Sequence, residues 1–85
     1  MDSAQGLPKL DLTTFFLSIS AAAYMGLEPA KIDLELARQN IELLELMREK
    51  TRGNRTADEE RLLEQLLFEL RMRYVEVSRV GGGAR

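Results

Sequence analysis

The sequence predicts an all-α fold of three helices, in which a short apolar helix precedes an antiparallel helical hairpin and dimerisation completes the core. Apolar residues recur at helical spacing over residues 34–51 and 57–79, and a short polar turn joins these two segments. The chain has 85 residues with no cysteine and no histidine. Disulfides and thiolate or imidazole metal sites therefore cannot reinforce its small core, which leaves oligomerisation.

The first predicted helix contains the most apolar stretch of the chain, FFLSISAAAYMG at residues 15–26. Asp11 or Thr13 can cap its beginning, and Gly26 is expected to end it in a left-handed conformation. The stretch is shorter than the roughly 20 apolar residues that a membrane span requires. Residues 21–23 resemble the cleavage site of an export signal, but the preceding segment lacks the positive charge of such signals. A core helix surrounded by protein on all sides is the favoured interpretation, and it implies a cytoplasmic protein.

The second predicted helix begins at Leu34, behind Asp33 as its cap, and ends near Thr51, with Gly53 as its stop. Asn40 falls near the middle of its apolar stripe, and two interpretations remain open. A buried amide can fix register or oligomeric state, as it does in coiled coils. We favour the second interpretation, a hydrogen bond to a neighbouring loop within the same fold, because most buried amides are satisfied locally.

The third predicted helix runs to about Arg79 and begins with a capping box formed by Thr56 and Glu59. It has two apolar faces. One suits the core and comprises Leu63, Leu66, Leu67, Leu70, Tyr74 and Val77; the other comprises Phe68, Met72 and Val75. A contiguous second stripe usually marks a contact surface. The sequence thus divides into a flexible tail at residues 1–10, one helical domain at residues 11–79, and a flexible tail at residues 80–85.

The apolar first helix and the second stripe of the third helix together predict a homodimer or a higher symmetric oligomer. Two-fold dimers are the commonest symmetric oligomers. The predicted interface residues are Phe15, Phe16, Ile19, Phe68, Met72 and Val75.

Basic residues gather where the second helix ends, which raises the possibility of an anion or RNA contact. The candidates are Arg48, Lys50, Arg52 and Arg55. Such clusters bind phosphate, but basic residues also stabilise a helix C-terminus through its dipole. The formal net charge of -2 and the absence of aromatic residues among them favour the second interpretation.

Catalytic and metal-binding patterns are absent from the sequence. The carboxylates of the second helix, such as Glu42, Glu45 and Glu49, have no histidine with which to form a metal site, and no pair of nucleophile and base occurs. A solvated acidic face is the simpler explanation. We therefore expect no enzymatic activity, no metal and no cofactor.

Two segments resemble a small bacterial family, domain of unknown function 1844. They are FFLSISAAAYMG and ARQNIELLELMREKTRGNRTADEERLLEQLLFELRMRYVE, and the similarity spans about residues 11–77. Its most specific parts are residues 41–56, which contain the EKTRGN turn, and the LLFELRMRYVE end of the third helix. The resemblance implies a short, all-helical, cytoplasmic protein and supplies no catalytic residues. We expect a self-associating interaction or adaptor protein, with a ribosome- or RNA-associated accessory protein that binds through residues 48–61 as the alternative.

Overall fold

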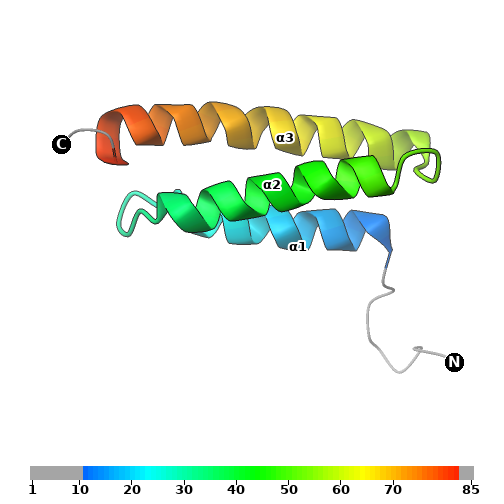
Figure 1. Cartoon of the computed structure of the whole chain (residues 1–85), viewed down its shortest axis with the longest axis horizontal. Helices are drawn as coiled ribbons and strands as arrows, with labels where there is room; N and C mark the ends of the chain where they lie inside the picture. The colour runs from blue at the N-terminus through cyan, green and yellow to red at the C-terminus, as the bar shows by residue number, and fades with distance from the viewer. Residues whose placement is uncertain (1–10, 83–85) are drawn as a thin grey trace, which may run out of the picture.

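The computed structural model describes residues 11–82, and the predicted tail at residues 1–10 lies outside them. Three helices follow one another along the chain, α1 (Leu12–Met25), α2 (Leu34–Lys50) and α3 (Ala57–Val77), and a π-helical turn spans Ser78–Gly82. Consecutive helices run in opposite directions (Figure 1). The predicted all-α class and the antiparallel hairpin of α2 and α3 are confirmed.

Each helix begins at the side chain that the sequence indicated. Asp11 accepts a hydrogen bond from the backbone N–H of Thr14 at 2.9 Å, and Asp33 accepts one from that of Leu36 at 3.1 Å. Thr56 and Glu59 form the reciprocal capping box at the start of α3. These bonds satisfy backbone donors that the first turn of a helix leaves without a partner.

The core lies between the three helices and consists almost entirely of aliphatic side chains. Leu27 belongs to it although it follows the end of α1, so the connection to α2 is itself packed against the bundle. Ser20 is the buried polar residue of α1, and its hydroxyl donates to the backbone oxygen of Leu17 at 2.9 Å. The buried hydrophobic residues are Phe16, Ile19, Ala23, Leu27, Ala37, Ile41, Leu44, Leu63, Leu66, Leu67 and Leu70.

Within a single chain, α1 is covered by protein on one side. Phe16 and Ala23 are completely buried against the other two helices. Phe15, Leu17 and Met25 remain exposed on the outer surface of the same helix. The expectation of a helix enclosed on all sides is therefore not met by one copy of the chain.

Gly26 and Gly53 have different structural roles, and the role of Gly26 differs from the predicted one. Gly26 has φ -73, so it is not left-handed as predicted; it is required instead for a close approach. A Cβ at Gly26 would lie 2.4 Å from the backbone oxygen of Asp33 and 2.8 Å from the backbone nitrogen of Ala37. Gly53, in the turn after α2, has φ 83, a conformation that glycine adopts without strain.

Asn40 is satisfied within its own helix. Its side-chain amide donates to the backbone oxygen of Leu36 at 3.0 Å, and the residue is half-buried. The amide is thus satisfied locally, as favoured from the sequence, but by the preceding turn of α2 and not by a loop.

The end of α3 differs from the predicted boundary. The α-helix ends at Val77 and continues as the π-helical turn Ser78–Gly82, which includes the first part of the segment predicted as a flexible tail. Residues 83–85 lie outside the described part of the chain.

We predict that Gly26→Ala destabilises the fold, because the added methyl group collides with backbone atoms that cannot rotate away. Overpacking of this kind costs about 1–3 kcal/mol. Urea unfolding monitored by circular dichroism measures the loss. Gly53→Asn is the control, since nothing lies within 4 Å of that Cβ position and asparagine tolerates positive φ. Equal stability of Gly26→Ala and wild type would contradict the close approach.

Candidate interaction surface

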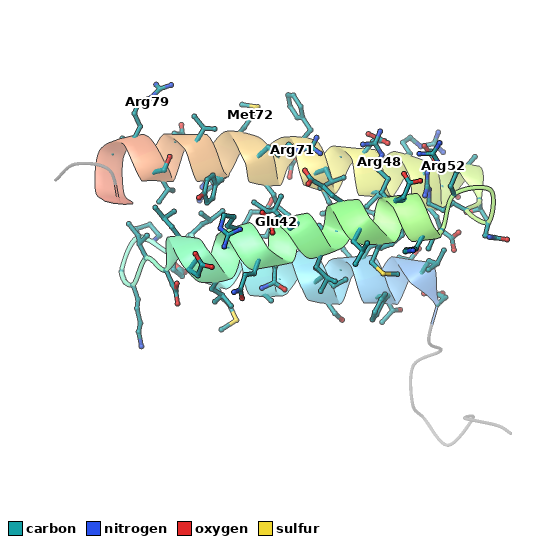
Figure 2. All side chains as sticks on the ribbon, in the orientation of Figure 1. Glu42, Arg48, Arg52, Arg71, Met72 and Arg79 are labelled. Atoms are coloured by element: carbon teal, nitrogen blue, oxygen red, sulfur yellow. The ribbon has the colours of Figure 1, made fainter. Side chains whose placement is uncertain are left out.

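The outer face of α3 carries the second apolar stripe that the sequence predicts. Phe68 is 63% exposed, Met72 57% and Val75 50%. Met72 projects from α3 on the side away from α2 (Figure 2). The three residues lie at i, i+4 and i+7, so their side chains occupy one side of the helix, while the buried leucines occupy the other. We call Phe68, Met72 and Val75 the outer stripe.

A shallow hollow follows the outer stripe. Its volume is about 530 Å³, and charged residues border its apolar floor. Apolar lining with a few charged groups at the rim is the usual composition of a protein contact surface. The hollow is lined by Phe68, Arg71, Met72, Val75, Glu76 and Arg79.

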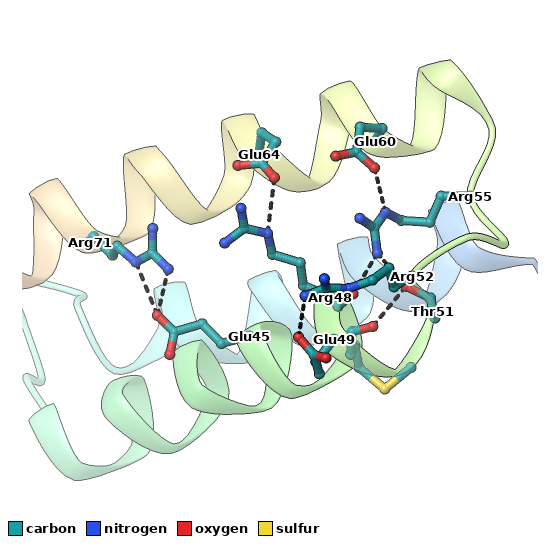
Figure 3. A network of polar contacts seen from close by, with 10 residues as sticks. Glu45, Arg48, Glu49, Thr51, Arg52, Arg55, Glu60, Glu64 and Arg71 are labelled. Atoms are coloured by element: carbon teal, nitrogen blue, oxygen red, sulfur yellow. Dashed lines mark hydrogen bonds and ion pairs between the residues drawn. The ribbon is translucent and has the colours of Figure 1, made fainter.

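Polar contacts hold α3 at its two edges and leave the outer stripe between them. On the α2 side, Arg71 donates to Glu45 at 2.6 and 3.0 Å, and Arg48 forms an ion pair with Glu64 at 3.0 Å (Figure 3). On the α1 side, the hydroxyl of Tyr24 donates to Glu69 at 3.2 Å. Leucine packing and these contacts fix the rotation of α3, so the outer stripe faces away from the bundle.

The six residues predicted at the dimer interface do not lie on one surface, because two of them are buried in the core. Phe16 and Ile19 are 0% and 6% exposed, because they pack in the core of the single chain. As placed, they are not accessible to a second copy. Phe15 is exposed but lines a different hollow on α1, which includes Leu12 and Ser18. The outer stripe is therefore the part of the predicted interface that forms one continuous accessible surface.

The basic residues near the turn lie together, but carboxylates already accompany them. Arg48 pairs with Glu64, and Arg52 pairs with Glu49 at 2.6 Å. The shallow hollow at this end is lined by acids as well as arginines, namely Glu45, Arg48, Glu49, Arg52, Arg55 and Glu60. Among the described residues Lys50 has no ion-pair partner, so it is the cation of this group that remains available.

Arg55 has a structural role that the sequence did not reveal. Its side chain is only 8% exposed, and it donates to the backbone oxygen of Arg48 at 2.6 Å, to the hydroxyl of Thr51 at 2.8 Å and to Glu60 at 2.7 Å (Figure 3). The guanidinium thereby joins the end of α2 to the start of α3. Arg55 directly precedes the N-cap of α3 and Glu60 lies in the first part of that helix, but the sequence does not show that the turn before Arg55 brings it back to the end of α2.

These contacts change the pKa of two ionisable groups. The hydrogen bond from Arg55 lowers the pKa of Glu60, because it favours the charged carboxylate. Partial burial, followed by the hydrogen bond to Glu69, raises the pKa of Tyr24, because both disfavour the phenolate. Neither Tyr24 nor Glu60 belongs to the outer stripe. The three residues of the stripe are themselves not ionisable.

Two further features of residues 11–82 bear on the kind of site. Within this range, no three acidic side chains lie close enough together to hold a metal ion. None of the helices described combines the length and the continuous apolar character that crossing a lipid bilayer requires.

The fold and the surface define the class of protein as a small three-helix bundle whose third helix exposes an apolar face. The family model for domain of unknown function (DUF1844) matches residues 9–76. The chain therefore belongs to this family, in agreement with the resemblance seen in its helices and turn. Neither a curated protein nor a solved structure matches the chain.

We predict that Arg55→Ala destabilises the protein by about 1–3 kcal/mol at pH 7, because the backbone oxygen of Arg48, the hydroxyl of Thr51 and the carboxylate of Glu60 lose a charged donor whose own side chain is largely buried. Arg52→Ala is the matched control, since the Arg52 side chain is 74% exposed and should contribute less than about 1 kcal/mol. Thermal unfolding of both variants measures the difference. Equal losses would contradict the anchoring role of Arg55.

The comparison of wild type with Arg55→Ala also yields a prediction about pH. The pKa of Glu60 is lower in the folded state than in the unfolded state, so its stabilising contribution is complete above the ordinary glutamate pKa of about 4.3 and is lost as pH falls through the lowered folded value. The stability difference between wild type and Arg55→Ala should therefore shrink as pH falls through this range. A difference that stays constant would show that the bond to Glu60 contributes nothing.

Proposed function

We propose that the protein is a non-enzymatic interaction protein of the bacterial cytoplasm that associates with itself through the outer stripe and serves as an adaptor. The observation that carries the proposal is the outer stripe, three large apolar side chains in one row, each at least half exposed. Single exposed apolar residues are common on protein surfaces, whereas a continuous row is not. The bacterial cytoplasm is inferred from the family resemblance and from the interpretation of residues 15–26 as a core helix and not an export signal.

The energetics favour covering this row. Complete burial of a large apolar side chain contributes about 1.5–3 kcal/mol relative to exposure. Three such residues in each subunit are substantial beside the total stability of about 5–15 kcal/mol that is typical of a folded domain. Part of this gain offsets the loss of translational and rotational freedom on association. A second copy presents the same row, so a two-fold dimer buries both rows at once.

Association with RNA or the ribosome through residues 48–61 is less well supported. Arg48, Arg52 and Arg55 already have carboxylate partners within the chain. An RNA phosphate would have to compete with these carboxylates for the arginines. The arginines would then neutralise few phosphates, so little counterion release would favour binding.

We therefore expect no salt-sensitive retention of RNA in a filter-binding assay at moderate ionic strength. Lys50→Gln combined with Arg52→Gln is the informative variant if RNA is retained, since both residues are exposed and neither anchors the turn. Retention by wild type that these changes abolish, with the fold preserved, would favour the nucleic-acid function over the adaptor function.

Self-association is tested by placing charge in the outer stripe. Phe68→Glu with Met72→Glu should convert the assembly to monomers and lower the melting temperature, because a carboxylate cannot be buried unpaired. Light scattering at micromolar concentration measures the mass, and the melting temperature of wild type should rise with protein concentration.

Met25→Glu is the matched control for these variants. Met25 is an exposed methionine of α1, 65% accessible against 57% for Met72, but it lies outside the outer stripe. It should leave the mass unchanged. A monomeric wild type whose melting temperature does not depend on concentration would overturn the proposed self-association.

A further inference from the structure

We propose that a second copy covers more than the outer stripe, and that the interface continues into a hollow at the end of the bundle. There the connection between α1 and α2 lies beside the last turn of α3 (Figure 1). We call this second depression the end hollow. The inference rests on the proposed self-association and deepens it by assigning a further part of the partner surface.

The outer stripe is too small to hold two copies together by itself. Its three side chains are 50–63% exposed. A large aromatic side chain buries about 150–250 Å², and with the upper value for all three residues the stripe offers less than about 450 Å² per copy. A stable interface buries about 800 Å² on each partner. A stable dimer therefore requires nearly as much surface again outside the stripe.

The end hollow supplies apolar surface next to the outer stripe. Its volume is about 250 Å³. Ile32 is 37% exposed and Val80 73%, so both remain accessible to a partner. Glu76 lines the end hollow and also the hollow along the outer stripe, so a partner seated on the stripe lies at the edge of the end hollow. The apolar residues that line the end hollow are Leu27, Pro29, Ile32, Val77 and Val80.

The spacing of exposed residues on α3 leads in the same direction. Every fourth residue from position 68 to position 80 is exposed, namely Phe68, Met72, Glu76 and Val80. Residues at this spacing form a ridge that is inclined to the helix axis, and a second helix packs beside such a ridge at about −50°. The ridge leads from the outer stripe to the end hollow, where Val80 belongs to the π-helical turn. A helix of the second copy that follows the ridge thus contacts both surfaces.

Glu76 is the charged member of this ridge, and two arginines beside it can compensate its charge. Arg73 precedes it by three residues and lines the end hollow, and Arg79 follows it by three residues and lines the hollow along the outer stripe. Within residues 11–82 neither arginine forms an ion pair. Residues three apart are neighbours on a helix, so either arginine can pair with the carboxylate when a partner excludes water from it.

Thiol labelling locates the covered surface, because the natural chain contains no cysteine. The variants are Val80→Cys and Ile32→Cys for the end hollow, Val75→Cys for the outer stripe, and Leu46→Cys as the control. Leu46 is 50% exposed on α2 and lines neither hollow. The rate of reaction with a maleimide is measured for each variant at protein concentrations below and above the Kd of the dimer.

The rates of Val80→Cys, Ile32→Cys and Val75→Cys should fall about fourfold between one tenth of the Kd and ten times the Kd, because the monomeric fraction falls from about 85% to about 20%. The rate of Leu46→Cys should not change. Protection of Val75→Cys without protection of the other two would overturn the inference and leave the proposed self-association in place. A chain that forms no dimer, or a dimer in which Val75→Cys is not protected, would overturn both.

A charged substitution provides a second test through the affinity. Val80→Glu should raise the Kd at least about tenfold, because the partner would then bury a second carboxylate one turn from Glu76. The high exposure of Val80 at the end of α3 means that the single chain can fold with this change. Leu46→Glu is the matched control and should leave the Kd unchanged. A Kd of Val80→Glu within about twofold of the wild-type value would overturn the inference.

Discussion

At Gly26 the backbone of α1 lies so close to the first turn of α2 that no β-carbon fits between them. The backbone N–H of Asp33 also donates to the oxygen of Gly26 at 2.8 Å, which closes the connection on itself. Asp33 caps α2, so one short segment ends the first helix, begins the second and sets the distance between them. Leu27 is buried as a consequence, and the leucines of α3 pack on the pair of helices that this contact defines.

Much of this fold can be predicted from the sequence because its signals are local. Asp11, Asp33 and Thr56 cap helices within four residues of themselves, and a leucine pattern at helical spacing identifies the inner face of α3 whatever it packs against. The outer stripe could be found for the same reason, since the opposite sides of a helix are determined by spacing alone. The close approach at Gly26 could not, because it depends on where a second helix lies in space.

Prediction of the candidate site from the sequence has the same limit, because part of it depends on where the other helices lie. Residues Phe15 and Phe16 are adjacent and chemically identical, yet the first is exposed and the second completely buried. An almost uniformly apolar helix gives no pattern from which to choose its inner face, so the predicted interface mixed core residues with surface ones. Arg55 was assigned to a cationic cluster for a related reason. Its partners come from the end of one helix and the start of the next, and only the turn brings them together.

The order of the helices has a consequence for how quickly the chain finds this arrangement. Each helix packs against the one that follows it, and the two connections, residues 26–33 and 51–56, are short. Contacts between sequence neighbours require little loop closure, and helical bundles of this topology fold within microseconds to milliseconds. The proposed association with a second copy would take a time that grows as the chains are diluted. In dilute solution the folded single chain is thus the species that forms first, and its outer α3 surface is complete before any encounter with a partner.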